Sequence, residues 1–191
     1  MRSKHVPEGI KSLGEHLENL DSALIVVDGS RLHEDIVYTL KDLLKHADYG
    51  VYVSLNKPHF TIERLLEKSK INLKRIYFVD CITAAAHYSL DKSHSRVLYA
   101  SHPSDLNFDG SIPRAITHFV DSIPGEKFIL VDALRTLFLY NEPALVVKFI
   151  RSLLDLKRHH SVKVVFMARN DFDEDIINRT HDLFDDVVHV P

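Results

Sequence analysis

Short apolar runs rich in β-branched residues alternate along this chain with segments whose apolar residues recur at helical spacing. The apolar runs are continuously hydrophobic, which is typical of strands that are covered on both faces. They occupy residues 23–27, 51–55, 75–79, 128–131 and 162–167, and two weaker runs at 96–100 and 186–190 are expected to add strands at an edge. The alternation predicts an α/β fold with three layers, in which helices flank a mostly parallel central sheet.

Helical spacing is clearest in two of the intervening segments. The apolar positions are Ile36, Val37, Leu40, Leu43 and Leu44 in the first, and Leu145, Val146, Phe149, Ile150, Leu153 and Leu154 in the second. Pro143 is well placed near the start of the second helix. A third helix is predicted from 113 to 120 with Ser111 as its N-cap, and a fourth from about Asp173.

The composition fits one globular domain with a single sizeable core. The chain has 191 residues, of which 45% are hydrophobic, and it contains neither an internal repeat nor a linker-like segment. We therefore expect residues 1–191 to form a single domain.

The net charge and the cysteine content indicate which kinds of binding partner and which cellular compartment to expect. The formal net charge is −3, so the chain as a whole does not attract a phosphate backbone, and the basic run at 157–160 is typical of a helix C-terminus. The single cysteine, Cys81, rules out an internal disulfide and fits a reducing compartment. No apolar stretch approaches the roughly 20 residues that span a bilayer. We expect a cytoplasmic protein that binds neither nucleic acid directly nor a membrane.

The segment after the first strand is the natural place for a phosphate-binding loop, because α/β sheets bind ligands at the carboxyl ends of their strands. A P-loop has the form GxxxxGK[ST], in which glycine backbone amides and a lysine hold the phosphates and a hydroxyl holds magnesium. Counted from Gly29, this chain has Glu34, Asp35 and Ile36 at the second glycine, the lysine and the hydroxyl. An acidic pair beside a triphosphate repels it, so the loop predicts no ATP or Mg²⁺ cofactor.

The order of these pieces resembles the RecA-like ATPases of the KaiC and Rad55 group, which is common in archaea. The runs at 23–27 and 128–132 are similar to the Walker A and Walker B strands of that group, and 51–55 is similar to its second core strand. Residues 6–10 resemble the segment that leads into the core, and 133–141 the segment that leads into the next helix. The resemblance covers nearly the whole chain and implies a RecA-like fold.

Most of the catalytic elements that the resemblance implies are absent. The glutamate pair that follows the second strand in active members is replaced by Asn56 and Lys57, and only Asp132, at the Walker B position, remains. A general base is therefore missing as well as the phosphate cradle. The expected remnant is a vestigial nucleotide pocket formed by Gly29, Ser30, Arg31, Asn56 and Asp132, with no catalytic residue and no metal ligand.

These losses favour a non-catalytic RecA/KaiC-like module that regulates or scaffolds through protein–protein association. The resemblance implies a protein partner, either a second copy of the chain or an active RecA-like ATPase.

A second hypothesis uses strand-end carboxylates. Asp28, Asp80 and Asp132 each follow or end a predicted strand, so a parallel sheet would deliver all three to one edge. Oxygen ligands suit Mg²⁺ or Mn²⁺, which would activate water for phosphodiester cleavage, as in NYN or PIN-like nucleases.

The histidines and the cysteine do not indicate a functional site. The 13 histidines show no zinc-binding spacing, and Cys81 has no partner motif, so it is predicted to be buried in the core.

Overall fold

The computed structural model describes residues 17, 20–28, 31–91, 93–171 and 173–190. Within them, seven strands form one sheet in the order β4-β3-β2-β5-β6-β1-β7, and every neighbouring pair is parallel. The strands are β1 (Ser22–Val27), β2 (Tyr49–Ser54), β3 (Ile76–Asp80), β4 (Val97–Tyr99), β5 (Lys127–Val131), β6 (Val162–Arg169) and β7 (Asp186–Val190). All seven predicted strands are confirmed within two residues at each end, and the two weaker runs form the two edges.

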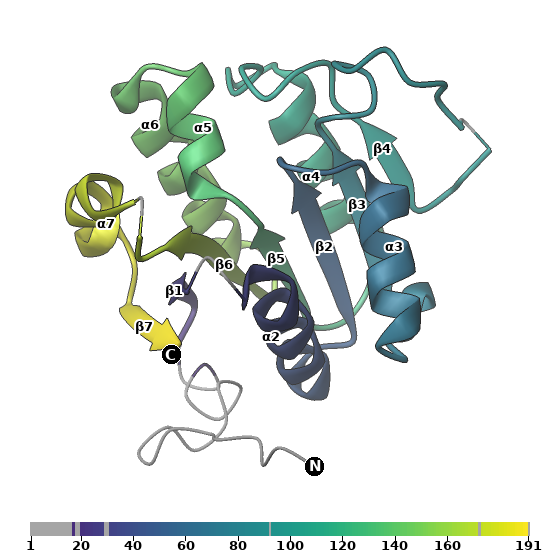
Figure 1. Cartoon of the computed structure of the whole chain (residues 1–191), viewed down its shortest axis with the longest axis horizontal. Coiled ribbons are helices and arrows are strands. Elements are labelled where there is room, and N and C mark those ends of the chain that lie inside the picture. Colours follow the sequence, from purple (N-terminus) through teal and green to yellow (C-terminus); the bar gives the residue numbers. More distant parts are fainter. Residues whose placement is uncertain (1–16, 18–19, 29–30, 92, 172, 191) are drawn as a thin grey trace.

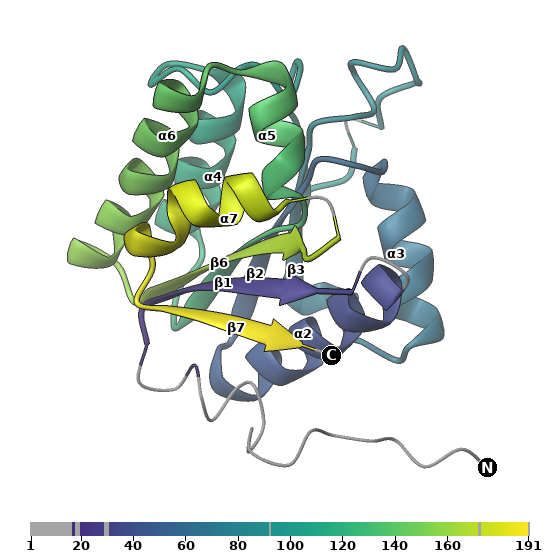
Figure 2. The same ribbon diagram turned by 60° about the vertical axis from the view of Figure 1, so that its left-hand side comes forward.

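The helices lie in two layers, one on each face of the sheet (Figures 1 and 2). They are α2 (Leu32–His46), α3 (His59–Lys68), α4 (Ser111–Ser122), α5 (Leu134–Tyr140), α6 (Pro143–Asp155) and α7 (Glu174–Thr180). One core cluster joins α2 and α3 to the sheet, and the other joins α4, α5 and α6 to its opposite face. The predicted three-layer α/β architecture is confirmed.

Alternation within each strand divides the core between these layers. In β1, Leu24 and Val26 pack in the cluster with α4 to α6, whereas Ala23, Ile25 and Val27 pack in the cluster with α2 and α3. Successive side chains of a strand point to opposite faces, so a strand covered on both faces needs apolar residues throughout. This is why the strands were visible in the sequence as unbroken apolar runs.

One helix prediction needs correction, and two helices were not predicted. Ser111 is the first residue of α4 and Gly110 is its N-cap, because the Ser111 hydroxyl donates to Asp105 Oδ2 at 2.6 Å instead of capping the helix. A side chain added at Gly110 would lie 2.5 Å from the Asp105 carbonyl oxygen, so only glycine fits there. Two shorter helices, α3 and α5, were not identified from the sequence.

The basic run at 157–160 lies beyond the end of α6, as expected. Lys157 Nζ lies 3.0 Å from a carboxylate oxygen of Asp21, and His160 Nε2 lies 3.2 Å from one of Asp121. Among the described residues, no helix combines the length and hydropathy needed to cross a bilayer.

Candidate functional site

At the carboxyl ends of β2 and β5, the chain connections lead away in opposite directions along the sheet. The chain passes from β2 outward to β3 and β4 on one side, and from β5 to β6 on the other. Ligands of open α/β sheets collect in the crevice at such a point. Asp132 directly follows β5 and Asn56 follows β2, so both of these predicted pocket residues lie beside this position.

Asp132 faces into the protein at this edge. Its Oδ1 accepts a hydrogen bond from the Leu55 backbone N–H at 2.8 Å, and its Oδ2 accepts one from the Tyr52 hydroxyl at 3.1 Å. The residue is only 4% exposed. Burial raises the pKa of Asp132 to about 7, although the bonds from Leu55 and Tyr52 oppose that rise. Both carboxylate oxygens are therefore occupied by donors from β2 and the loop that follows it.

The residues beside Asp132 are also engaged within the chain. The Asn56 side-chain oxygen accepts a hydrogen bond from Thr136 Oγ1 at 2.7 Å, which ties the loop after β2 to α5. Lys57 Nζ donates to His33 Nε2 at the start of α2, and the Ser54 hydroxyl donates to the Lys57 carbonyl. Burial, with Lys57 as the smaller contribution, lowers the pKa of His33.

The remaining predicted pocket residues follow β1 in the sequence. Gly29 and Ser30 are outside the described residues. Arg31 Nε lies 3.5 Å from Glu34 Oε2, and both side chains are exposed. Asp35 is buried, and burial raises its pKa to about 6.

The rim around the carboxyl ends of β1, β5 and β6 carries mixed charge. Arg169 NH2 lies 2.8 Å from Asp171 Oδ2, and Arg135 NH1 lies 3.8 Å from Asp173 Oδ1. Arg31 is matched by Glu34 in the same way. Each arginine that could attract a phosphate thus has a carboxylate beside it, which reduces its attraction for another anion.

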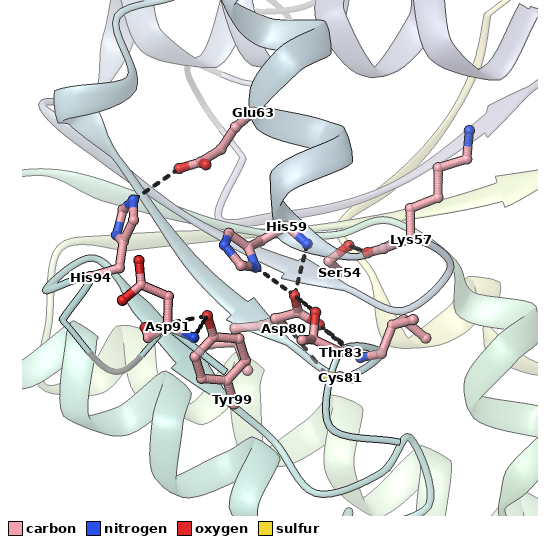
Figure 3. A network of polar contacts seen from close by, with 12 residues as sticks. Ser54, Lys57, His59, Glu63, Asp80, Cys81, Thr83, Asp91, His94 and Tyr99 are labelled. Carbon is pink, nitrogen blue, oxygen red and sulfur yellow. Dashed lines mark hydrogen bonds and ion pairs between the residues drawn. The ribbon is translucent and has the colours of Figure 1, made fainter. Parts of the chain in front are cut away.

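A separate polar network lies at the ends of β3 and β4 (Figure 3). Asp80 is its centre and is fully buried. Its Oδ2 accepts hydrogen bonds from the His59 backbone N–H and Nδ1, both at 2.7 Å, and from the Thr83 hydroxyl at 2.6 Å. Its Oδ1 accepts the Ile82 and Thr83 backbone N–H groups at 2.8 Å. One carboxylate therefore fixes both the first residue of α3 and the turn after β3.

At Asp80, hydrogen bonding lowers the pKa by more than burial raises it. Burial alone would raise its pKa, but the bonds from His59 and Thr83 lower it to about 2. Asp80 is consequently ionised at neutral pH.

The rest of the network surrounds the His59 ring. His94 Nε2 lies 3.3 Å from Glu63 Oε1 on α3, and the His59 ring packs edge-to-face against Tyr99 with centroids 5.5 Å apart (Figure 3). Tyr99 in turn bonds the backbone of Asp91 through its hydroxyl. The His59 side chain is 7% exposed, and the Thr83 hydroxyl donates its hydrogen bond to Asp80. These contacts around His59 therefore hold α3, β3 and β4 together.

His59 was missed in the sequence, whereas Thr83 had a usable signal. An Asp followed three residues later by Thr at a strand end is typical of a turn closed by side-chain hydrogen bonds. No local pattern connects Asp80 to His59, which lies 21 residues earlier.

The three strand-end carboxylates of the nuclease hypothesis do not converge. Neighbouring strands lie about 4.8 Å apart, so β3 and β5 are separated by roughly 10 Å and β3 and β1 by roughly 19 Å. Asp80 and Asp132 also direct their oxygens at donors of their own chain. Within the described part of the chain, no three His, Cys, Asp or Glu side chains form a metal-binding group.

Comparison with known proteins extends this picture. The model of one family, described as a family of unknown function (DUF7090), matches residues 21–191. No curated protein matches the chain. Among solved structures, the uncharacterized protein PH0321 from Pyrococcus horikoshii, in complex with an unknown peptide, has a TM-score of 0.66. It is 12% identical, and the match covers 93% of this chain and 82% of that one.

Two further structures are ATPase-related. The KaiC-like protein PH0186 from Pyrococcus horikoshii OT3 has a TM-score of 0.52 at 13% identity, covering 87% of this chain and 70% of that one. A type III secretion ATPase from pathogenic bacteria has a TM-score of 0.52 at 12% identity, covering 90% and 51%. At these identities the likeness shows the fold alone, which is that of the RecA-like P-loop ATPases.

Proposed function

The chain belongs to the DUF7090 family of unknown function, and we propose that it is a non-catalytic RecA-like module that acts by binding another protein. The observation that carries this proposal is the engagement of Asp132. A Walker B aspartate holds hydrated magnesium through free carboxylate oxygens, whereas both oxygens of Asp132 accept hydrogen bonds from Tyr52 and Leu55. Hydrated magnesium would have to reach the remaining lone pairs of a carboxylate that is only 4% exposed, in competition with these two hydrogen bonds.

Charge around the end of β1 supports the same proposal. Asp35 stands at the position of the P-loop lysine, and its carboxyl is mostly ionised at pH 7 because its pKa is about 6. A triphosphate placed beside it would meet a negative charge in a poorly screened setting. Arg31, Arg135 and Arg169 each lie beside a carboxylate and so offer little compensation.

A surface for a partner is available at the carboxyl edge of the sheet. Phe108, Leu139 and Tyr140, which we call the apex surface, are 85%, 66% and 52% exposed. Their segments are joined, because Asn141 Nδ2 donates to the Pro103 carbonyl and the His102 and Tyr140 rings pack with centroids 4.9 Å apart. Exposed apolar groups gathered in this way often mark protein-binding sites.

The comparison with PH0321 makes a peptide-like ligand reasonable. That protein shares the fold and holds an unknown peptide. We propose that the apex surface of this chain takes a segment of a protein partner, either a second copy or an active RecA-like ATPase, in the cytoplasm.

The absence of nucleotide binding and hydrolysis is tested by titrating labelled ATP into the pure protein with and without Mg²⁺, measuring both bound ATP and released phosphate, and repeating both measurements on Asp132→Ala. We expect no saturable binding in any of the four conditions. ATP turnover that requires both Mg²⁺ and Asp132 would overturn the non-catalytic proposal.

The binding role is tested separately by capturing partners from extracts of the native cell. The wild type is compared with Phe108→Ser and Leu139→Ser, and with Tyr38→Ser as a matched control, since Tyr38 is an aromatic 40% exposed on α2. We expect one protein to be retained by the wild type and the control and lost by both apex variants. Equal retention by all four proteins would argue against the apex surface.

A further inference from the structure

One flank of α2 buries oxygen atoms. Asp35, Thr39 and Asp42 are 4%, 1% and 2% exposed, and their spacing of four and three residues places them on one side of the helix. The apolar residues that anchor α2 to the sheet, Ile36 and Leu40, lie on the adjacent side. Figure 2 shows this helix below β1 and β7, on one face of the sheet.

Two of these oxygens have no hydrogen-bond partner. Asp35 Oδ2 and Thr39 Oγ1 are both buried and unpaired, whereas Asp42 Oδ1 lies 2.7 Å from Lys45 Nζ. Buried polar atoms in folded proteins are nearly always paired, so two unpaired oxygens on one flank point to a missing partner. Residues four apart on a helix have Cβ atoms about 5–6 Å from each other, a gap that one bound species can bridge.

The charge around the gap decides what that species is. Asp35 lies in the field of two further carboxylates, Asp28 and Glu34, and of one cation, Arg31. These four charges sum to about −2 when all are ionised, so an anion is disfavoured. The unpaired atoms are a carboxylate oxygen and a hydroxyl oxygen, which are ligands that hard cations prefer.

We propose that a hard metal cation binds between the Asp35 carboxylate and the Thr39 hydroxyl on α2. Mg²⁺ is commonly held by one or two carboxylates and keeps several waters, whereas Ca²⁺ takes more protein oxygens. Neither Asp35 nor Thr39 is the magnesium ligand of the P-loop pattern, which uses the hydroxyl at position 36 and the Walker B aspartate. The cation therefore binds without a nucleotide and stabilises the fold.

The test is thermal unfolding of the full chain, first freed of metal with EDTA and held without nucleotide. Mg²⁺, Ca²⁺, Na⁺ and K⁺ are each titrated at constant ionic strength, which separates the possible sources of the cation. We expect one of them to raise the unfolding midpoint saturably, by roughly 5–10 °C at a hundred times its Kd. Titration calorimetry should give one site per chain.

Matched variants locate the site. Asp35→Asn and Thr39→Val should abolish the shift. Glu34→Gln, which removes the same charge at an exposed neighbour, and Thr39→Ser, which keeps the hydroxyl, should retain it. If Asp35→Asn fails to fold, the comparison of Thr39→Val with Thr39→Ser decides. Affinity should also fall below pH 6, because protons then compete for the carboxylate.

Two results would overturn the proposal. One is a wild type whose midpoint shows no saturable response to any of the four cations. The other is a response of equal size in Thr39→Val and Thr39→Ser, which would place the bound ion elsewhere.

Discussion

The Nδ1 atom of His59 lies 2.7 Å from Oδ2 of Asp80, and neither side chain is more than 7% exposed. The same oxygen also accepts the backbone N–H of His59 at 2.7 Å. This pair joins residues from α3 and β3 that are 21 positions apart. The edge of the sheet is thus held by a buried carboxylate whose two oxygens accept hydrogen bonds from donors of its own chain.

Replacing Asp80 with alanine should therefore weaken the fold severely. The change leaves the donors of His59, Ile82 and Thr83 without their acceptor, and breaking such a buried network typically costs about 3–5 kcal/mol. Urea denaturation of Asp80→Ala measures this loss in the free energy of unfolding. Asp182→Ala is the control, because the Asp182 side chain is 90% exposed and should change stability by less than about 0.5 kcal/mol. A loss below 1 kcal/mol in Asp80→Ala would mean that the network contributes little.

The contributions of Asp132 and Asp80 to the free energy of unfolding should respond to pH in opposite directions. The folded-state pKa of Asp132 is about 7 against a usual 3.8, so its contribution is complete below pH 4 and is lost as pH rises through 7. The folded-state pKa of Asp80 is about 2, so its contribution is present above pH 4 and is lost as pH falls through 2.

The Asp132 response is measured by urea denaturation between pH 4 and 8. Wild-type stability should fall across that range, with an Asp132 share of at most about 4 kcal/mol at roughly 1.4 kcal/mol per pKa unit. Asp132→Asn, which cannot titrate, should flatten the curve and leave the smaller share of Asp35. A curve of unchanged slope in Asp132→Asn would rule out the raised pKa.

The hydroxyl of Tyr52 should matter through Asp132. Tyr52→Phe removes the donor to Asp132 Oδ2 and leaves that buried oxygen unsatisfied, which should cost about 1–3 kcal/mol of the free energy of unfolding. Tyr77→Phe removes a hydroxyl from a half-buried ring on the neighbouring strand and serves as the control. Equal stability of the two variants would show that the Tyr52 hydroxyl contributes nothing.

Any side chain introduced at Gly50 in β2 should destabilise the fold. A Cβ added there would lie 2.2 Å from the nearest atom of the Phe128 ring, on the adjacent strand β5. Gly50→Ala should destabilise the protein by about 1–3 kcal/mol through overpacking. Phe128→Leu in the same chain should recover part of that loss, and a double-mutant cycle of the free energies of unfolding measures the coupling. Additive losses would show that the cost of a side chain at Gly50 does not come from the Phe128 ring.

The sequence was sufficient for the sheet because its strands are covered on both faces and therefore appear as unbroken apolar runs. It also placed Asp132 and Asp80 at strand ends, since each polar residue directly follows an apolar run. It could not show where their oxygens point. Tyr52 and Asp132 are 80 residues apart, and only the pairing of β2 with β5 brings the hydroxyl to the carboxylate.

The missed elements have a comparable origin. In α3 only three residues are buried, namely His59, Ile62 and Leu66. The helix α5 spans only seven residues. Such short segments carry too few periodic positions to be separated from loops by pattern alone. Their positions depend on contacts with distant parts of the chain, including Asp80 for α3 and Asn56 for α5.

Cys81 follows Asp80 directly, is fully buried, and is the one cysteine in the sequence. Burial, together with the charges of Asp132 and Asp80, raises the pKa of its thiol and keeps it unreactive in the folded protein. A thiol reagent can modify it only after β3 and its neighbours separate. The rate at which a reagent labels this one sulfur therefore reports how often the β3 side of the sheet opens to solvent.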